Sequence, residues 1–343
     1  MDKKRLLTFI VAVLAVTGIA VCIVVFTVVP IPTLFSEQIA LFTRNKPRAE
    51  ITVAVVSPEE TVITAYGHDG AEISVPGRSY EIGAVSETFT GAIAAKAVED
   101  GYLSLQTATS DVLVLSKGGY EPTVYELLTH SSAYSDYSPG VSVKGRGNPY
   151  MGIDGNTVIG DINSFRLSRN PPYLYSPSRF GAAVLGVMIS KVYDVDFYSI
   201  MTIFAQQNLG LTDTGISLDS GLEKSWLWYN NDAYIASLGL TSTINDMVSY
   251  AELYLEGSES YLRTASEPLY EISADTCAGY LWLVSKGTGV LSRSGSTSGY
   301  SAAIKIDPIY GTAVIVLSNY PDDRYGSTAE LADALMYEKT GRT

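Results

Sequence analysis

The sequence is poor in the residues that hold metal ions and form disulfides. Its 343 residues include two cysteines, Cys22 and Cys277, and two histidines, His68 and His130. Cys22 lies within a long apolar run, so no disulfide inside a folded domain is expected. No cysteine, histidine and carboxylate residues have the spacing of zinc ligands. We therefore expect neither a metal site nor a cofactor.

Basic residues are scarce beyond the N-terminus. Residues 1–35 hold three basic residues and one acidic residue, which leaves 20 basic and 35 acidic residues, a net charge of −15, in the rest of the chain. Binding to nucleic acids or to anionic lipid surfaces depends on cationic contacts. Nucleic acid is therefore not an expected partner. The simplest interpretation of the negative charge is solubility.

The N-terminus carries one long uncharged segment, residues 6–29, which are 24 residues without a charge. As a helix it would be about 36 Å long, enough to cross a hydrocarbon core of about 30 Å. No small-x-small cleavage site follows, so an uncleaved transmembrane anchor is favoured over a cleaved signal peptide or a lipoprotein. Lys3, Lys4 and Arg5 favour a cytoplasmic tail at residues 1–5, with the body outside the cytoplasmic membrane.

The rest of the chain is predicted to form a linker and one domain. Residues 30–48 contain three prolines and are interpreted as a juxtamembrane linker, and residues 49–340 as the domain. Hydrophobic patterning predicts strands at 51–57, 61–66, 279–285, 289–294, 300–307 and 312–319, and helices at 87–100, 179–193, 244–255 and 327–338. Strands at both ends around a helical middle favour an α+β fold with an antiparallel sheet over alternating βαβ units.

Five short segments follow one another in an informative order. Residues 81–91 read EIGAVSETFTG, residues 127–134 read LLTHSSAY, residues 173–177 read YLYSP, residues 238–247 read LGLTSTINDM, and residues 293–300 read RSGSTSGY. Together they resemble motifs of the serine β-lactamase and penicillin-binding-protein superfamily, most closely its class C-like branch. Five blocks in order are far more specific than any one of them.

The resemblance covers residues 47–340 and implies a β-lactamase/transpeptidase-like fold. Such a fold has an antiparallel sheet built from both ends of the chain, helices on each face, and an inserted, mainly helical subdomain. The resemblance also implies a serine hydrolase of β-lactamase, D-Ala-D-Ala peptidase or esterase type. His130 matches a family histidine that is usually structural.

The family's catalytic residues are largely replaced in this chain. The position of the nucleophilic serine falls on Ala84, and that of the lysine one helical turn later falls on Glu87. The family tyrosine matches Tyr175, but the asparagine two residues later is Pro177, which has no side-chain donor or acceptor. A methyl group cannot act as a nucleophile, and Glu87 reverses the charge of the lysine.

The third family motif is better preserved. Arg293, Ser294 and Gly295 match the pattern Lys/His-Thr/Ser-Gly, with the positive charge retained. The resemblance implies an oxyanion hole made by the backbone N–H groups of Ala84 and Ser296, which do not depend on side chains. Arg293 is therefore expected either to bind a carboxylate or peptide-like ligand or to neutralise the carboxylate that replaces the lysine.

Three functions follow from this pattern. The three lost catalytic positions favour a membrane-anchored pseudo-hydrolase that binds a ligand or partner without turnover. The alternative is an active hydrolase with altered machinery, in which Ser86, Tyr175 or Ser294 is the nucleophile and Glu87 the general base. The third is a scaffold protein whose cleft has filled in and whose 24 tyrosines supply an interaction surface.

Overall fold

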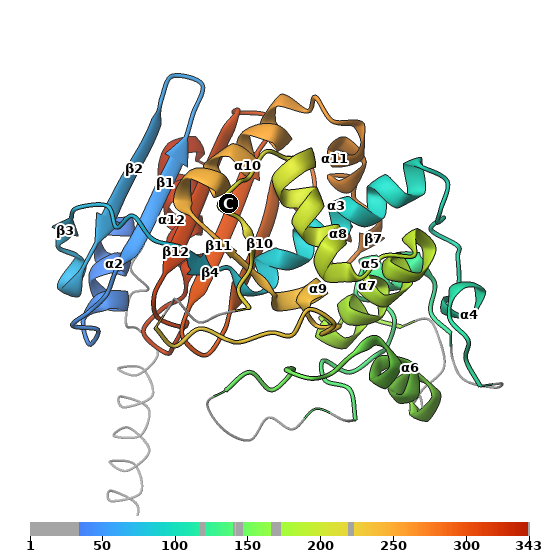
Figure 1. The fold of residues 1–343 in the computed structure, drawn as a ribbon. Helices are drawn as coiled ribbons and strands as arrows, with labels where there is room; N and C mark the ends of the chain where they lie inside the picture. Colours follow the sequence, from blue (N-terminus) through green and yellow to red (C-terminus); the bar gives the residue numbers. More distant parts are fainter. Residues whose placement is uncertain are drawn as a thin grey trace, which may run out of the picture.

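The computed structural model describes residues 34–116, 121–139, 141, 147–165, 173–218 and 223–341. The predicted cytoplasmic tail at 1–5 and transmembrane segment at 6–29 lie outside the described residues. Among the helices that are described, none has both the length and the hydrophobicity needed to cross a bilayer. Figure 1 shows a large sheet beside a mainly helical region.

The core of the fold is a nine-stranded antiparallel sheet in the order β3-β2-β1-β12-β11-β10-β9-β8-β7. Strands from the two ends of the chain meet at its centre, where Ile51 pairs with Ser318. In chain order the strands are β1 (Ile51–Val56), β2 (Thr61–Tyr66), β3 (Glu72–Ile73), β7 (Tyr270–Glu271), β8 (Thr276–Gly279), β9 (Trp282–Ser285), β10 (Leu291–Ser296), β11 (Ser301–Asp307) and β12 (Thr312–Ser318). The predicted antiparallel α+β architecture is therefore present.

One predicted strand, 279–285, is wrong in its first part. Gly279 ends β8 and Trp282 begins β9, and the two residues between them turn the chain with positive φ angles, 50° at Tyr280 and 66° at Leu281. Left-handed angles at both central residues suit the right-handed twist of a two-residue hairpin. Both side chains are buried. The sequence of the turn is therefore as hydrophobic as that of a strand, which is why a continuous strand was predicted.

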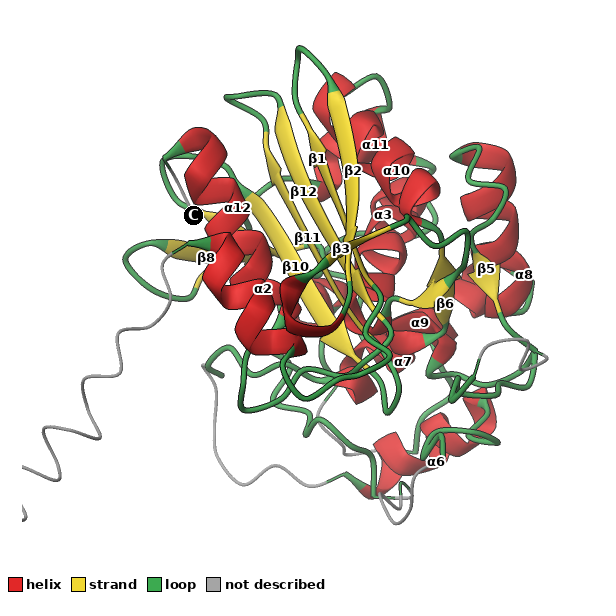
Figure 2. Cartoon of the chain, turned by 90° about the vertical axis from the view of Figure 1, so that its left-hand side faces the viewer, coloured by secondary structure: helices red, strands yellow, loops and turns green. Residues whose placement is uncertain are grey.

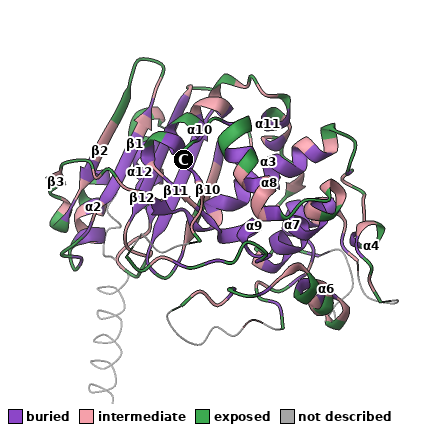
Figure 3. Ribbon diagram, viewed as in Figure 1, coloured by how far each residue is buried: buried purple, intermediate pink, exposed green. Residues whose placement is uncertain are grey.

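Helices cover both faces of the sheet, as Figure 2 shows. On one face lie α2 (Phe35–Thr43) and α12 (Thr328–Thr340), and on the other lies α10 (Ile244–Glu256), which packs on β1, β11 and β12. All seven residues of β11 and all seven of β12 are buried, because helices shield both sides of the central strands (Figure 3).

The predicted linker at 30–48 is wrong for its described part. Residues 35–43 form α2, in which Phe35, Ile39 and Phe42 are buried and join an apolar cluster with α12 and the sheet. Their i, i+4, i+7 spacing gives the helix one apolar face. The N-terminus of α2 is also held by the backbone N–H of Phe35, which donates to Glu338 Oε1 at 2.8 Å. The folded body therefore begins before residue 49.

The helical region between the two halves of the sheet agrees with the predicted subdomain. Its long helices are α3 (Ser86–Glu99) and α7 (Arg179–Tyr193), each within one residue of its predicted bounds. The shorter helices are α4 (Thr109–Val112), α5 (Val124–Leu128), α6 (Gly155–Ser164), α8 (Phe197–Ile203), α9 (Ile235–Leu238) and α11 (Ser260–Ala265), with short helical turns η2 (Gly83–Val85) and η3 (Phe204–Asn208). A further helical turn, η1 (His68–Gly70), lies between β2 and β3 and packs against α2. A small sheet of β4 (Tyr80–Glu81), β6 (Leu240–Ser242) and β5 (Gly215–Ile216) completes the fold.

Candidate functional site

A cleft of about 380 Å³ lies where η2 and the start of α3 meet β10 and the loop before α7. It is lined by Ala84, Glu87, Asp136, Tyr175, Pro177, Ser178, Arg179, Leu283, Arg293, Ser294, Gly295 and Ser296. The eight residues that the sequence assigns to the site are all in this lining. Three segments far apart in the chain therefore converge as the motif order predicts.

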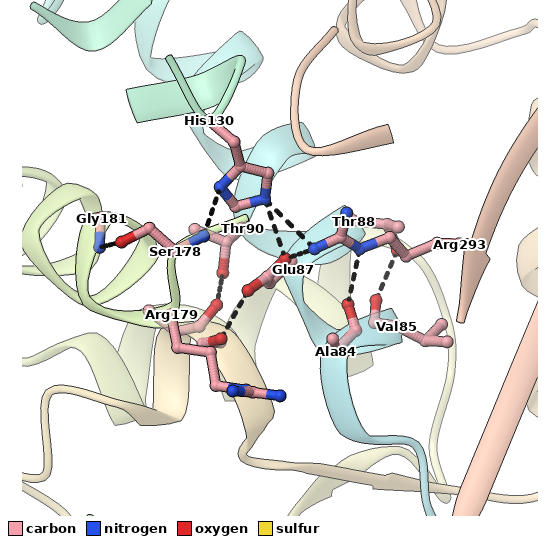
Figure 4. Close-up of polar contacts among 12 residues, drawn as sticks. Ala84, Val85, Glu87, Thr88, Thr90, His130, Ser178, Arg179, Gly181 and Arg293 are labelled. Carbon is pink, nitrogen blue, oxygen red and sulfur yellow. Dashed lines mark hydrogen bonds and ion pairs between the residues drawn. The ribbon is translucent and has the colours of Figure 1, made fainter. Parts of the chain in front are cut away.

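Glu87 is the most enclosed charged residue of the cleft, with 1% of its surface exposed. Ser237 Oγ donates to its Oε1 at 2.5 Å. Arg293 Nη2 donates to its Oε2, as Figure 4 shows. His130 Nε2 lies 3.4 Å from the same Oε2. Both carboxylate oxygens are thus occupied by protein donors, so the network is closed without any ligand.

Arg293 reaches Glu87 from β10, and its Nε also donates to the backbone oxygen of Ala84 at 3.3 Å. Its side chain is 9% exposed, and burial lowers its pKa to about 10. The guanidinium therefore remains charged at neutral pH and forms a buried ion pair with the carboxylate. Of the two roles expected for Arg293, the structure has the pairing with Glu87.

His130 connects this ion pair to the start of α7. Its φ of 52° is a left-handed angle, and its Nδ1 accepts a hydrogen bond from the backbone N–H of Ser178 at 3.2 Å. The neutral ring then carries its proton on Nε2, which faces the carboxylate of Glu87. Burial lowers the pKa of His130 to about 4, so the ring is neutral near pH 7. These contacts are those of a positioning residue.

The backbone beside Ala84 approaches β10 very closely. A Cβ atom added to Gly295 would lie 2.0 Å from the backbone nitrogen of Ala84, so only glycine fits there. Gly83 has a φ of 52° and an added Cβ would lie 2.8 Å from the nitrogen of Ser296. These two glycines let the backbone of η2 and the end of β10 share one edge of the cleft.

Two backbone N–H groups, those of Ala84 and Ser296, lie at this edge of the cleft. In antiparallel strands, hydrogen-bonded residue pairs alternate with pairs that are not hydrogen-bonded. Thr297 N donates to Tyr300 O, so the next pair along the strands, Ser296 and Ser301, is not hydrogen-bonded. The N–H of Ser296 therefore points away from β11. The backbone nitrogen of Ala84 lies at the same edge, against Gly295. Both residues line the cleft, where such N–H groups suit a carbonyl or anionic oxygen.

Tyr175 and Pro177 form the opposite wall. The Tyr175 ring stands edge-on to the His130 ring, with centroids 6.1 Å apart, and the loop is held by the N–H of Ser176, which donates to His130 O at 2.8 Å. Burial raises the pKa of the Tyr175 phenol, which makes it a poorer source of a phenolate. Pro177 is exposed and offers no polar side-chain atom.

One proposed nucleophile, Ser86, is not in the cleft. It is fully buried, and its Oγ accepts a hydrogen bond from Leu240 N at 3.1 Å. Ser86 immediately precedes Glu87 in α3, and its side chain lies on the face of the helix that packs against the protein interior. Ser294 is exposed and lines the cleft, as does Tyr175. The altered-hydrolase hypothesis therefore keeps two of its three candidate nucleophiles.

Four polar residues of the site, Asp136, Ser178, Arg179 and Ser237, were not predicted from the sequence. Ser237 comes from α9, 150 residues from Glu87, and no motif marks it. Arg179 and Asp136 form an ion pair on the cleft wall, in which Arg179 N also donates to Asp136 Oδ1 at 3.1 Å. Arg179 could have been identified from the sequence, because it is a cation two positions after Pro177 and at the start of a predicted helix. Among the residues that the structure describes, no three histidine, cysteine or acidic side chains are grouped to hold a metal ion.

Known proteins resemble this chain in sequence and in fold. A sequence model of the Beta-lactamase family matches residues 39–337. A β-lactamase of Providencia stuartii is 25% identical over 222 residues, which are 60% of this chain and 55% of the relative, so the match spans little more than half the relative's length.

Solved structures show the same fold at low sequence identity. A class C β-lactamase from Rhodobacter sphaeroides has a TM-score of 0.70 and 18% identity, with 89% of this chain and 100% of that chain covered. The octameric penicillin-binding protein homologue from Pyrococcus abyssi has a TM-score of 0.69 and 21% identity, with 100% and 78% covered. The family model covers well over half of the chain, so the chain belongs to the Beta-lactamase family.

Proposed function

We propose that this protein is a membrane-anchored, extracytoplasmic member of the family whose cleft binds a ligand or partner without turning it over. The observation that carries the proposal is the buried ion pair of Glu87 and Arg293 beside the methyl group of Ala84. A carboxylate and a methyl group occupy the positions that match the family's lysine and serine.

The chemistry of nucleophilic catalysis supports this proposal. Acyl transfer needs a hydroxyl or thiol and a neighbouring base that removes its proton. Ala84 supplies no such group, and a carboxylate held by a cation and a hydroxyl donor is a weak base. Glu87 also offers no free oxygen to the cleft, because Ser237 and Arg293 occupy both.

The open cleft favours binding over the scaffold hypothesis. A collapsed cleft would indicate a scaffold, whereas Tyr175 and Arg293 line a cavity of about 380 Å³ that also reaches the N–H groups of Ala84 and Ser296. A carboxylate or a peptide-like ligand is the class that such donors would bind.

Membrane anchoring is supported by the sequence alone. Residues 6–29 are long and apolar enough to span a bilayer, and the basic residues before them favour a cytoplasmic N-terminus. Carbonate extraction of membranes and protease treatment of intact cells test this part. We expect the chain to stay with the membrane and its body to be digested from outside.

Covalent labelling tests the absence of turnover. The full chain is incubated with a penicillin and, separately, with a broad serine-reactive phosphonate, and its intact mass is measured. We expect no adduct with either reagent, together with ligand-dependent thermal stabilisation. A stoichiometric adduct on Ser294 or Tyr175 would favour the altered hydrolase, and neither adduct nor stabilisation by any ligand would favour the scaffold.

A further inference from the structure

Glu81 is a buried carboxylate beside the two segments that carry the N–H groups of Ala84 and Ser296. It is 3% exposed, lies three residues before Ala84, and accepts a hydrogen bond from Thr297 Oγ1 at 2.5 Å, next to Ser296. Its other oxygen accepts the backbone N–H of Trp226. Both partners are uncharged donors, and no lysine or arginine in the described part of the chain forms an ion pair with Glu81.

A second carboxylate, Asp322, lies on the other side of the same edge. Its backbone N–H donates to Ser296 Oγ at 3.4 Å, and its carboxylate accepts from Thr328 N at 2.9 Å and Thr328 Oγ1 at 3.2 Å. The cation that acts on it is Lys46, but Lys46 Nζ lies 3.2 Å from Asp323 Oδ2 and its charge is balanced there.

The other charges around the cleft balance one another. Arg293 pairs with Glu87 on the floor, and Arg179 pairs with Asp136 on the wall. Lys224 lies nearby, with its Nζ 5.3 Å from the centre of the Tyr320 ring, but its side chain is exposed and water screens its charge. Glu81 and Asp322 therefore remain without an ion pair on the two sides of this edge, and burial raises the pKa of both carboxyl groups.

From this arrangement we infer that the cleft selects an uncharged carbonyl group, such as an internal peptide amide or an ester, and rejects a free carboxylate. Two N–H dipoles attract any oxygen, but carboxylates without an ion pair on the two sides of this edge repel an anion and not a neutral carbonyl. The inference rests on the proposed binding function and narrows its ligand from carboxylate or peptide-like to uncharged and peptide-like.

A matched pair of probes tests the selection. N-acetyl-alanyl-alanine with a free C-terminal carboxylate and the same dipeptide as its N-methyl amide differ only in that terminal group. Titration calorimetry of the full chain at neutral pH measures both. We expect the amide to bind at least about tenfold more tightly.

Charge-removing variants separate electrostatics from shape. Asp322→Asn and Glu81→Gln each remove one carboxylate. Each variant is therefore expected to reduce the difference in affinity between the amide probe and the carboxylate probe. Asp275 lies on an exposed turn of the sheet. Asp275→Asn also removes one carboxylate, but away from the cleft, and is expected to leave the difference in affinity between the two probes unchanged. Asp322 is only partly buried, so its variant gives a result even if Glu81→Gln fails to fold.

The outcomes keep this inference distinct from the proposed function. If the carboxylate probe binds as tightly as the amide, or if Asp322→Asn leaves the ratio unchanged, the selection is overturned while ligand binding stands. If neither probe binds at millimolar concentration, the peptide-binding role of the cleft fails and the inference fails with it. Gly295→Ala places a methyl group against Ala84 N and is expected to weaken the binding of both probes.

Discussion

Glu87 and Arg293, 206 residues apart in the chain, form an ion pair in the cleft in which Ser237 and Arg293 hold the two oxygens of the carboxylate. Glu87 is 1% exposed and the Arg293 side chain 9% exposed. The pair joins the first turn of α3 to β10, so it connects the helical region to the sheet. Removing one member leaves the other charge buried without a partner, which is far more costly than removing both.

A double-mutant cycle tests the ion pair. We expect Glu87→Ala to lower the free energy of unfolding by about 3–5 kcal/mol, because Arg293 is left buried and unpaired. Arg293→Ala should have a similar effect through Glu87. The double variant should lose less than the sum of the two, as measured by urea denaturation. Additive losses would contradict a direct pair.

Restoring the family residues is expected not to restore activity. Ala84→Ser supplies a hydroxyl, but Glu87 remains bound to Arg293 and cannot act as its base. In the double variant Ala84→Ser with Glu87→Lys, two cations face one another in a buried site, and Pro177 still lacks the asparagine side chain. We expect no penicillin adduct in the intact mass of either variant, and a lower melting temperature for the double variant. An adduct at position 84 in the double variant alone would show that two substitutions suffice.

The stability of the protein is expected to depend on His130 below pH 6.5. The pKa of His130 is about 4 in the folded state and 6.5 as its ordinary value, so the unfolded chain takes up a proton first as the pH falls. The free energy of unfolding should therefore decrease from about pH 6.5 to pH 4, by about 3 kcal/mol in total from this residue.

His130→Asn provides the comparison for that pH profile. Asparagine tolerates the left-handed backbone angle at this position and offers an oxygen to the N–H of Ser178. The variant should lose the His130 contribution to the slope between pH 6.5 and 4 in urea denaturation. Equal slopes in the two proteins would mean that His130 titrates normally in the folded state.

Gly295 is expected to be required for the close approach of β10 to Ala84. Gly295→Ala forces a Cβ against the backbone nitrogen of Ala84, at 2.0 Å before any shift, so we expect a loss of several kcal/mol in the free energy of unfolding. Gly160→Ala in α6 is the matched control, because nothing lies within 4 Å of the added methyl group. That change should stabilise the helix by about 0.5–1 kcal/mol.

Helix α2 is expected to be part of the folded domain. Ile39→Ala should lower the free energy of unfolding by about 2–5 kcal/mol, because the side chain is 2% exposed within the cluster between α12 and the sheet. Leu34→Ala, five residues earlier and 51% exposed, should change it by less than about 0.5 kcal/mol. Equal small effects at both positions would support the linker that the prolines predict.

Local patterns in the sequence predicted the regular elements well. Periodic apolar residues define α7 at its observed bounds, and β-branched runs define β1, β2, β11 and β12 to within one residue at each end. The prediction was wrong where buried apolar residues do not adopt the conformation that their hydrophobic pattern indicates. Tyr280 and Leu281 are buried like strand residues but form a turn. The prolines on both sides of α2 predict a linker, whereas residues 35–43 form a helix that packs on the domain.

The sequence by itself determined the family, the order of the motifs and the presence of Ala84, Glu87 and Pro177 where the resemblance places the family's catalytic side chains, because these depend on residue identity and on spacing along the chain. Only the tertiary structure decided that Arg293 neutralises Glu87, that Ser237 holds the other oxygen, and that Ser86 faces the interior. Such contacts join residues some 150–200 positions apart, and no local pattern encodes them. They exist because the sheet closes with strands from both ends of the chain and brings β10 against the start of α3.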